Sequence, residues 1–167
     1  MIEHADQESL DLLARRHGER LLARGLMLVT AQSSTGGWVA KTVTDCAGSS
    51  QWFERGFVTY SNTAKQEMLG VAAGILDAYG AVSEPVVRAM VAGALAHSHA
   101  QVAVAISGIA GPGGGTPGKP VGTVWCAWGV PLGGITACGL RFDGDREAVR
   151  LAAVRVALAG LLERVPP

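Results

Sequence analysis

A chain of 167 residues is the size of one domain and is long enough to bury a substantial core. Its 14 basic and 14 acidic residues cancel, which argues against a nucleic-acid surface as the main function. The three cysteines are far apart, the first residues lack a signal-peptide pattern, and no apolar run approaches the roughly 18 residues of a membrane helix. We therefore expect a single domain over residues 1–167 that is soluble, cytoplasmic and bound neither to a membrane nor to nucleic acid.

Hydrophobic periodicity and breaker residues divide the first half of the chain into alternating helices and strands. In chain order they predict a helix at 7–24, a strand at 26–31, a helix at about 36–46, a strand at 57–60, and a short helix from an N-cap at Asn62 through Leu69.

The second half continues the same alternation. It predicts a helix opened by Ser83 and Pro85, a buried strand at 102–106, a glycine-rich loop at 108–118, two strands around 121–129 and 134–142, and a last helix from near Asp145. The pattern indicates an α/β fold, a layered single domain in which helices cover a mixed β-sheet.

The turn at residues 31–37 follows a buried strand and precedes a helix. Ser33, Ser34 and Thr35 lie in it, followed by two glycines. Backbone N–H groups at such a helix start carry partial positive charge and can hold an oxyanion or a phosphate. A serine in this turn could be a nucleophile; the alternative is that the hydroxyl residues only cap a helix.

Tyr60 and Lys65 flank a strand-to-helix junction. A lysine acts as a general base only if burial or nearby positive charge lowers its pKa, and a tyrosine hydroxyl could relay or orient the proton. The alternative is a solvated lysine on a helix face.

The segment from Ser107 to Pro120 contains the letters of a dinucleotide fingerprint and of a P-loop. Both motifs need a helix directly afterwards, and Pro120 with the strand after it excludes that. What remains is a loop of low side-chain bulk that lets a ligand approach the backbone, or else a purely structural loop.

Arg146 opens the last helix, where its guanidinium could pair with a phosphate. The alternative is a surface ion pair with a carboxylate such as Asp143. The four histidines form no metal-ligand pattern, so no metal site is predicted.

Together these segments resemble the C-terminal domain of the CinA (competence/damage-inducible) family, which includes stand-alone nicotinamide mononucleotide deamidases. The similarity spans roughly residues 8–163. The matching segments are Thr30–Gly37, Gly48–Ser50, Gly56, Tyr60–Asn62, Lys65, Leu69–Val71, Gly80–Ser83, Ser107–Gly114, Lys119–Val124 and Gly144–Arg146.

The resemblance implies hydrolysis of nicotinamide mononucleotide to nicotinic acid mononucleotide and ammonia, without a cofactor or metal, by a homodimer. The family's serine nucleophile corresponds to Ser33, its lysine base to Lys65 and its tyrosine to Tyr60. The resemblance also implies that the N–H groups of residues 34–37 would stabilise the oxyanion. The expected substrate-binding residues are Gln32, Ser34, Thr35, Gly36, Gly48, Ser107, Gly108, Gly111 and Arg146.

At three of these positions the chain departs from the family's usual residue. Gln32 replaces a glutamate, Ser34 a frequent cysteine, and Ser107 a threonine. The alternative function is a nucleotide-binding or partner-binding member of the same family with weakened catalysis.

Overall fold

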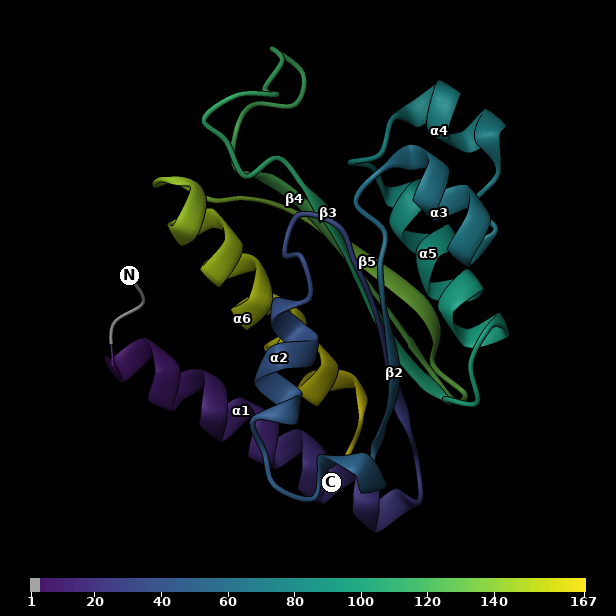
Figure 1. Ribbon diagram of the computed structural model, residues 1–167, viewed down its shortest axis with the longest axis vertical. Coiled ribbons are helices and arrows are strands. Elements are labelled where there is room, and N and C mark those ends of the chain that lie inside the picture. The colour runs from purple at the N-terminus through teal and green to yellow at the C-terminus, as the bar shows by residue number, and fades with distance from the viewer. Residues whose placement is uncertain (1–3) are drawn as a thin grey trace.

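Strand β3 lies at the centre of a five-stranded mixed sheet in the computed structural model, which describes residues 4–167 (Figure 1). The strands are β1 (Leu28–Gln32), β2 (Phe53–Val58), β3 (Val102–Gly108), β4 (Thr123–Val130) and β5 (Gly134–Arg141), in the spatial order β2-β1-β3-β4-β5. β2, β1 and β3 run parallel, whereas β4 pairs antiparallel with both β3 and β5. The predicted mixed sheet is therefore confirmed.

Helices cover both faces of this sheet (Figure 1). Within residues 4–167 they are α1 (His4–Arg24), α2 (Trp38–Thr44), α3 (Asn62–Leu69), α4 (Ala73–Tyr79), α5 (Glu84–Ala96) and α6 (Arg146–Arg164), with a short 3-10 helix, η1 (Ser49–Gln51). α1, α2 and α6 lie on one side of the sheet, and α3, α4 and α5 lie on the other. None of these helices combines the length and the apolar character needed to cross a bilayer.

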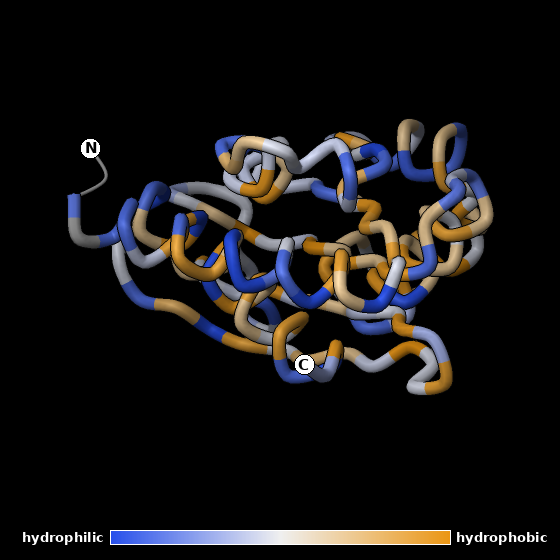
Figure 2. The backbone as a smooth tube through the Cα atoms, turned by 90° about the horizontal axis from the view of Figure 1, so that it is seen from below, coloured by the Kyte–Doolittle hydropathy of each residue, from blue (hydrophilic) through white to orange (hydrophobic). Residues whose placement is uncertain are grey.

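The sheet divides the hydrophobic core into two layers. Val104 and Ile106 of β3 pack toward α6, and Ala103 and Ala105 pack toward α5. All four are fully buried, as expected for a central strand covered on both faces. In Figure 2 hydrophilic and hydrophobic residues alternate along the helical turns, because each helix buries only one face.

Three features of the fold differ from the sequence expectation. β2 begins at Phe53 instead of residue 57, because it is an edge strand whose first half is polar and partly exposed. Helix α4 was not predicted; Leu76 is its single buried residue and no side chain caps its start, so its hydrophobic pattern is weak. Ser61, not Asn62, is the N-cap of α3, and its side chain accepts a hydrogen bond from the N–H of Ala64.

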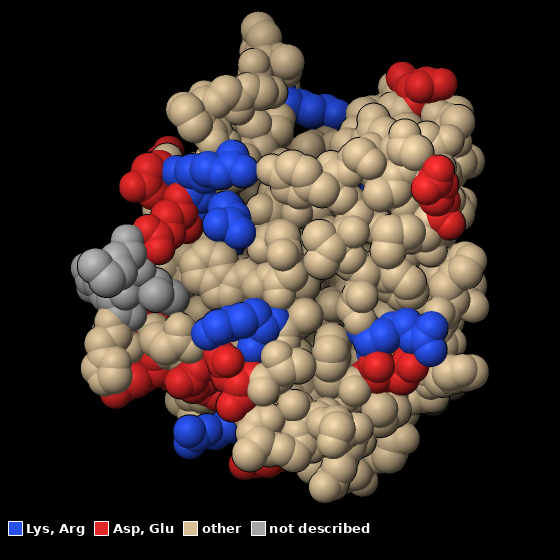
Figure 3. All heavy atoms as spheres, viewed as in Figure 1, with Lys and Arg blue, Asp and Glu red and all other residues tan. Residues whose placement is uncertain are grey.

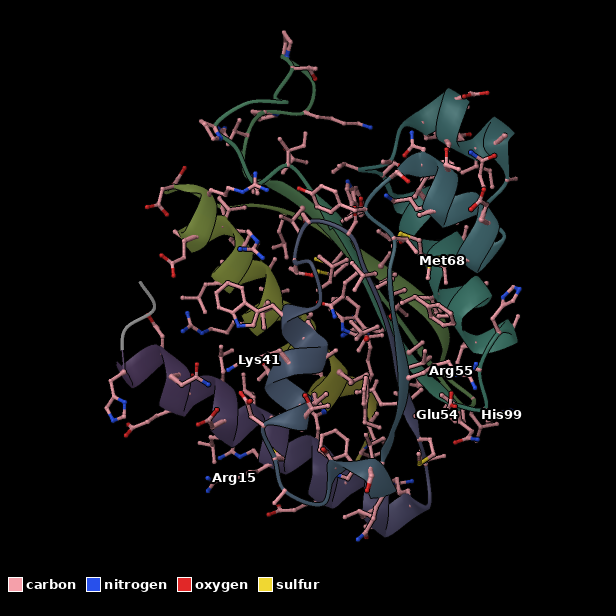
Figure 4. The ribbon with its side chains drawn as sticks, viewed as in Figure 1. Arg15, Lys41, Glu54, Arg55, Met68 and His99 are labelled. Atoms are coloured by element: carbon pink, nitrogen blue, oxygen red, sulfur yellow. The ribbon has the colours of Figure 1, made fainter. Side chains whose placement is uncertain are left out.

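The edge strand β2 is fixed at its amino-terminal end by the loop after α5 (Figure 4). Glu54 and Arg55 form an ion pair of 2.8 Å. The N–H of His99 donates to Glu54, and Arg55 donates to the carbonyl of His97. These contacts attach the side chains of the edge strand to the loop, and charged side chains on an edge strand disfavour pairing with another chain.

His17 in α1 makes folding stability depend on pH. Its Nε2 donates to the Leu158 carbonyl at 2.6 Å, and burial lowers its pKa to about 4. As the pH falls from 6.5 to 4, the unfolded chain therefore binds this proton first, and stability is lost over that window. The loss attributable to His17 should reach roughly 3 kcal/mol by pH 4.

Replacing this residue tests the linkage. In His17→Gln, the free energy of unfolding from urea titrations should fall less between pH 7 and pH 4 than in the parent, by about that amount. Equal pH slopes in the two proteins would contradict the assignment, whatever the absolute stability of the variant.

Candidate active site

The carboxyl ends of the parallel strands β1 and β3 meet at one edge of the sheet, where an open α/β sheet forms its ligand crevice. Ser33 follows β1 directly, and Ser107 is the penultimate residue of β3. The backbone N–H of Ser33 donates to the Ile106 carbonyl at 3.0 Å, which ties the two strand ends together. The start of the turn is thus fixed by the central strand.

Ser33 and Lys65 form the central pair of the site. The Lys65 Nζ atom lies 3.1 Å from the Ser33 hydroxyl oxygen and 3.0 Å from the Thr59 carbonyl oxygen. Lys65 is only 1% exposed and Ser33 is 8% exposed. The alternative of a solvated lysine on a helix face is therefore wrong.

The environment of Lys65 favours its neutral amine. Burial lowers the pKa of Lys65, because the ammonium loses hydration. The hydrogen-bond partners of Nζ within residues 4–167 are a hydroxyl and a carbonyl, and neither carries a full negative charge that would hold the proton. A neutral lysine amine at this distance from a serine hydroxyl can accept its proton.

The turn after Ser33 contains backbone N–H groups close to the Ser33 hydroxyl in the chain. The N–H of Gly36 donates to the Ser33 carbonyl at 3.0 Å, so this donor, expected to face an oxyanion, is already used. The N–H groups of Ser34, Thr35 and Gly37 remain as candidate oxyanion donors, and those of Ser34 and Thr35 are nearest to Ser33 in the chain. Gly36 and Gly37 have φ angles of 61° and 104°, and α2 consequently begins at Trp38, two residues later than predicted.

Gln32 lies on the other face of the sheet from Ser33. Its Oε1 accepts from the Thr35 hydroxyl at 2.8 Å and from the Val39 N–H at 2.9 Å. The side chain is buried, and its Nε2 has no hydrogen-bond partner in the described part of the chain. The structure therefore places the Gln32 side chain against the turn and the start of α2, on the side of the sheet away from Lys65.

Tyr60 and Arg146 close the outer side of the site. Arg146 donates to the Gly111 carbonyl at 2.8 Å and to the Tyr60 hydroxyl at 3.0 Å. In the described residues Arg146 forms no ion pair with Asp143. Tyr60 is 63% exposed and contacts Arg146, not Lys65.

These side chains border one cavity of about 280 Å³. Its lining includes Ser33, Ser34, Tyr60, Asn62, Lys65, Ser107, Gly108, Gly111 and Arg146. Gly108 keeps the cavity open, since a Cβ atom there would lie 3.1 Å from the Ser34 hydroxyl oxygen and 2.9 Å from Val124. The volume is near the lower end of the range for small-molecule sites.

Four of the expected binding residues, Gln32 and three others, lie outside this cavity. Gly48 lies shortly before β2 in the chain. Because Phe53, the first residue of β2, pairs with Leu28, the first residue of β1, Gly48 is at the amino-terminal end of these strands and the cavity is at their carboxyl end. Thr35 and Gly36 line a neighbouring groove of about 630 Å³ with Trp38, Lys41 and Arg150. Arg146 borders both spaces.

Asn62 lines the cavity without having been predicted as a site residue, and two further residues that contact Lys65 or the turn were also not predicted. Thr59 supplies a carbonyl to Lys65, and only packing reveals that contact. Arg150 donates to the carbonyls of Ser34 and Thr35. Its spacing was a usable signal, because Arg150 lies four residues after Arg146 and therefore on the same helix face.

Basic side chains gather near this edge of the molecule. Figure 3 shows lysine and arginine side chains over the amino-terminal end of α6, with acidic side chains on their outer flank. Within residues 4–167, no three His, Cys, Asp or Glu side chains come close enough to hold a metal ion. Arg146, Arg150 and Lys41 therefore place positive charge along the groove beside the turn.

The protein is a three-layer α/β domain that holds a buried serine and a buried lysine in hydrogen-bond contact at the carboxyl end of a parallel strand. The chain belongs to the CinA C-terminal domain family, which it matches over residues 10–165. The nicotinamide-nucleotide amidohydrolase PncC of Escherichia coli (strain K12) is 56% identical over 153 residues, covering 91% of this chain and 92% of that protein. PncC of Pseudomonas putida is 51% identical over 156 residues, covering 93% and 97%.

Solved structures agree with this assignment. The crystal structure of competence/damage inducible protein CihA from Agrobacterium tumefaciens superposes with a TM-score of 0.90. The two sequences are 46% identical, and the match covers 93% of this chain and 94% of that one.

Proposed function

We propose that the protein is a nicotinamide-nucleotide amidohydrolase that converts nicotinamide mononucleotide and water to nicotinic acid mononucleotide and ammonia. The observation that carries the proposal is the buried Ser33–Lys65 pair, 3.1 Å apart, at the floor of a cavity that Arg146 borders. The name of the Escherichia coli and Pseudomonas putida relatives supports the same reaction.

The reaction proceeds through an acyl-enzyme. Neutral Lys65 takes the proton of Ser33 while Oγ attacks the carboxamide carbon, and the N–H groups of Ser34 and Thr35 stabilise the oxyanion. The carbon–nitrogen bond breaks as the Lys65 ammonium returns the proton, so ammonia leaves. Water then gives a proton to Lys65 and attacks the ester, and the acid is released as Ser33 regains its proton.

Ammonia release from purified protein supplied with nicotinamide mononucleotide tests the proposal. We expect equal amounts of ammonia and nicotinic acid mononucleotide, with no loss of rate in EDTA. The rival function, a nucleotide-binding module without turnover, predicts saturable binding of the mononucleotide with no ammonia. Activity lost in EDTA and restored by a divalent metal would contradict the serine–lysine chemistry.

Arg146 is the expected partner of the substrate phosphate. It lies at the amino terminus of α6, where helix N–H groups also favour an anion. Removing a charged partner of phosphate costs about 1.5–3 kcal/mol, which is roughly a ten- to hundred-fold loss of apparent affinity. Arg146→Ala should raise the KM for nicotinamide mononucleotide by that factor and barely change any activity on nicotinamide riboside.

Tyr60→Phe is the matched control, because it removes the hydroxyl that Arg146 contacts and keeps the guanidinium. Its KM should stay within about threefold of the parent value, since the lost contact is a single exposed hydrogen bond. An equal loss of activity on nicotinamide mononucleotide and nicotinamide riboside in Arg146→Ala would contradict this role. It would mean that Arg146 supports the loop around Gly111 and does not bind the phosphate.

A further inference from the structure

Arg150 is bound to the backbone of the catalytic turn. Its Nε donates to the Ser34 carbonyl at 3.1 Å, and its Nη2 donates to the Thr35 carbonyl at 3.2 Å. The guanidinium carbon lies 5.5 Å from the centroid of the Trp38 ring, within range of a cation–π interaction. Three contacts therefore hold one half-buried guanidinium against the turn.

These contacts determine which way the turn presents its donors. In a trans peptide the C=O and the following N–H point in opposite directions. A Ser34 carbonyl held toward α6 therefore directs the N–H of Thr35 away from α6. The peptide between Thr35 and Gly36 shows the same opposition. The Thr35 carbonyl accepts from Arg150, and the Gly36 N–H donates to the Ser33 carbonyl.

No other cation near the turn contacts these carbonyls in residues 4–167. Lys41 lines the same groove but pairs with Asp45 at 2.7 Å. Arg146 donates to Gly111 and Tyr60. Among the cationic side chains of residues 4–167, Arg150 is therefore the one that joins these carbonyls to helix α6.

We propose that Arg150 is a positioning residue that fixes the peptide between Ser34 and Thr35, so that the Thr35 N–H faces the oxyanion formed on the substrate. The inference rests on the proposed function. Its charge lies on the far side of that peptide from the nucleophile, so Arg150 acts through the backbone and not on the substrate directly. Loss of Arg150 should lower the rate of acylation and leave the binding of nicotinamide mononucleotide nearly unchanged.

The test compares Arg150→Met, Arg150→Lys and a matched control, Arg155→Met. Arg155 lies on the same helix, is partly buried, and pairs with Asp6, away from the turn. Removing an oxyanion donor outright lowers kcat about 10²- to 10³-fold, so a donor left in place but poorly oriented should lose roughly 10- to 100-fold. We expect this loss in kcat for Arg150→Met, with KM within about twofold and partial recovery in Arg150→Lys.

Arg155→Met should keep the parent kcat. Unchanged kcat in Arg150→Met would overturn the inference, as would a raised KM alone or an equal loss in Arg155→Met. The last result would mean that α6 has lost its general packing.

A second measurement separates this inference from the proposed function. A fluorophosphonate probe labels an activated serine and requires the oxyanion donors, but it does not require a nucleotide. If the parent protein releases no ammonia from nicotinamide mononucleotide, the proposed function fails. Slower labelling of Ser33 in Arg150→Met than in Arg155→Met would still support the inference, and equal labelling would overturn it.

Discussion

Ammonia release from nicotinamide mononucleotide is expected to fall by at least about a thousandfold when Ser33 is replaced by alanine, because the acyl-enzyme can no longer form. The Lys65 amine lies 3.1 Å from the Ser33 hydroxyl oxygen, and alanine leaves no side-chain oxygen at this position to attack the substrate. Steady-state kinetics with an ammonia-coupled assay measures the loss. Substrate binding should survive, since the phosphate contact through Arg146 is intact.

Ser34→Ala is the control for Ser33→Ala. Both hydroxyls border the cavity, but only that of Ser33 is within hydrogen-bond distance of Lys65. We expect Ser34→Ala to retain most of the parent rate, because its backbone N–H is unchanged. If Ser33→Ala turned over at the parent rate, or if Ser34→Ala were the inactive variant, the nucleophile assignment would be wrong.

Lys65→Met is expected to be nearly as damaging, with turnover reduced by about a thousandfold or more, because the serine hydroxyl then has no base. Methionine fills most of the space of the lysine side chain without an amine. The free energy of unfolding should stay near the parent value or rise, since the buried amine loses hydration on folding. Urea unfolding of both proteins checks that the loss is chemical and not structural.

The pH profile of the parent protein gives an independent check on Lys65. A protonated lysine cannot accept the serine proton, so kcat/KM should rise with pH and level off above the pKa of Lys65. Burial lowers that pKa, so the rise should end below the usual lysine range. A profile that is flat at low pH and falls as the pH rises would contradict Lys65 as the base.

Much of this site was predictable because its chemistry lies in short local patterns. A buried strand followed by hydroxyl residues and two glycines predicted the turn that holds Ser33, and the structure has that turn after β1. The pairing of Ser33 with Lys65 was implied only by the family resemblance. No local pattern gives it, because the distance depends on how α3 packs beside the end of β1.

The side-chain direction of Gln32 was a missed inference. Successive residues of a strand point to opposite faces, so Ala31 and Ser33 share one face and Gln32 has the other. The structure follows that rule, with Ala31 packed in the α5 layer and Gln32 bonded to Val39 of α2. Glutamate at this position would therefore place its charge at the start of α2 and not beside Lys65.

The contacts that assemble the site join parts of the chain that are far apart in sequence. Lys65 and Ser33 are separated by 32 positions, Arg146 and Tyr60 by 86, and Arg150 and Ser34 by 116. Contacts of such long range form slowly, because the chain loses the conformational entropy of closing a long loop before the contact can stabilise it. During refolding, enzymatic activity should therefore reappear after the helical circular dichroism signal, and a chain truncated before α6 should remain inactive even where its first strands and helices have formed.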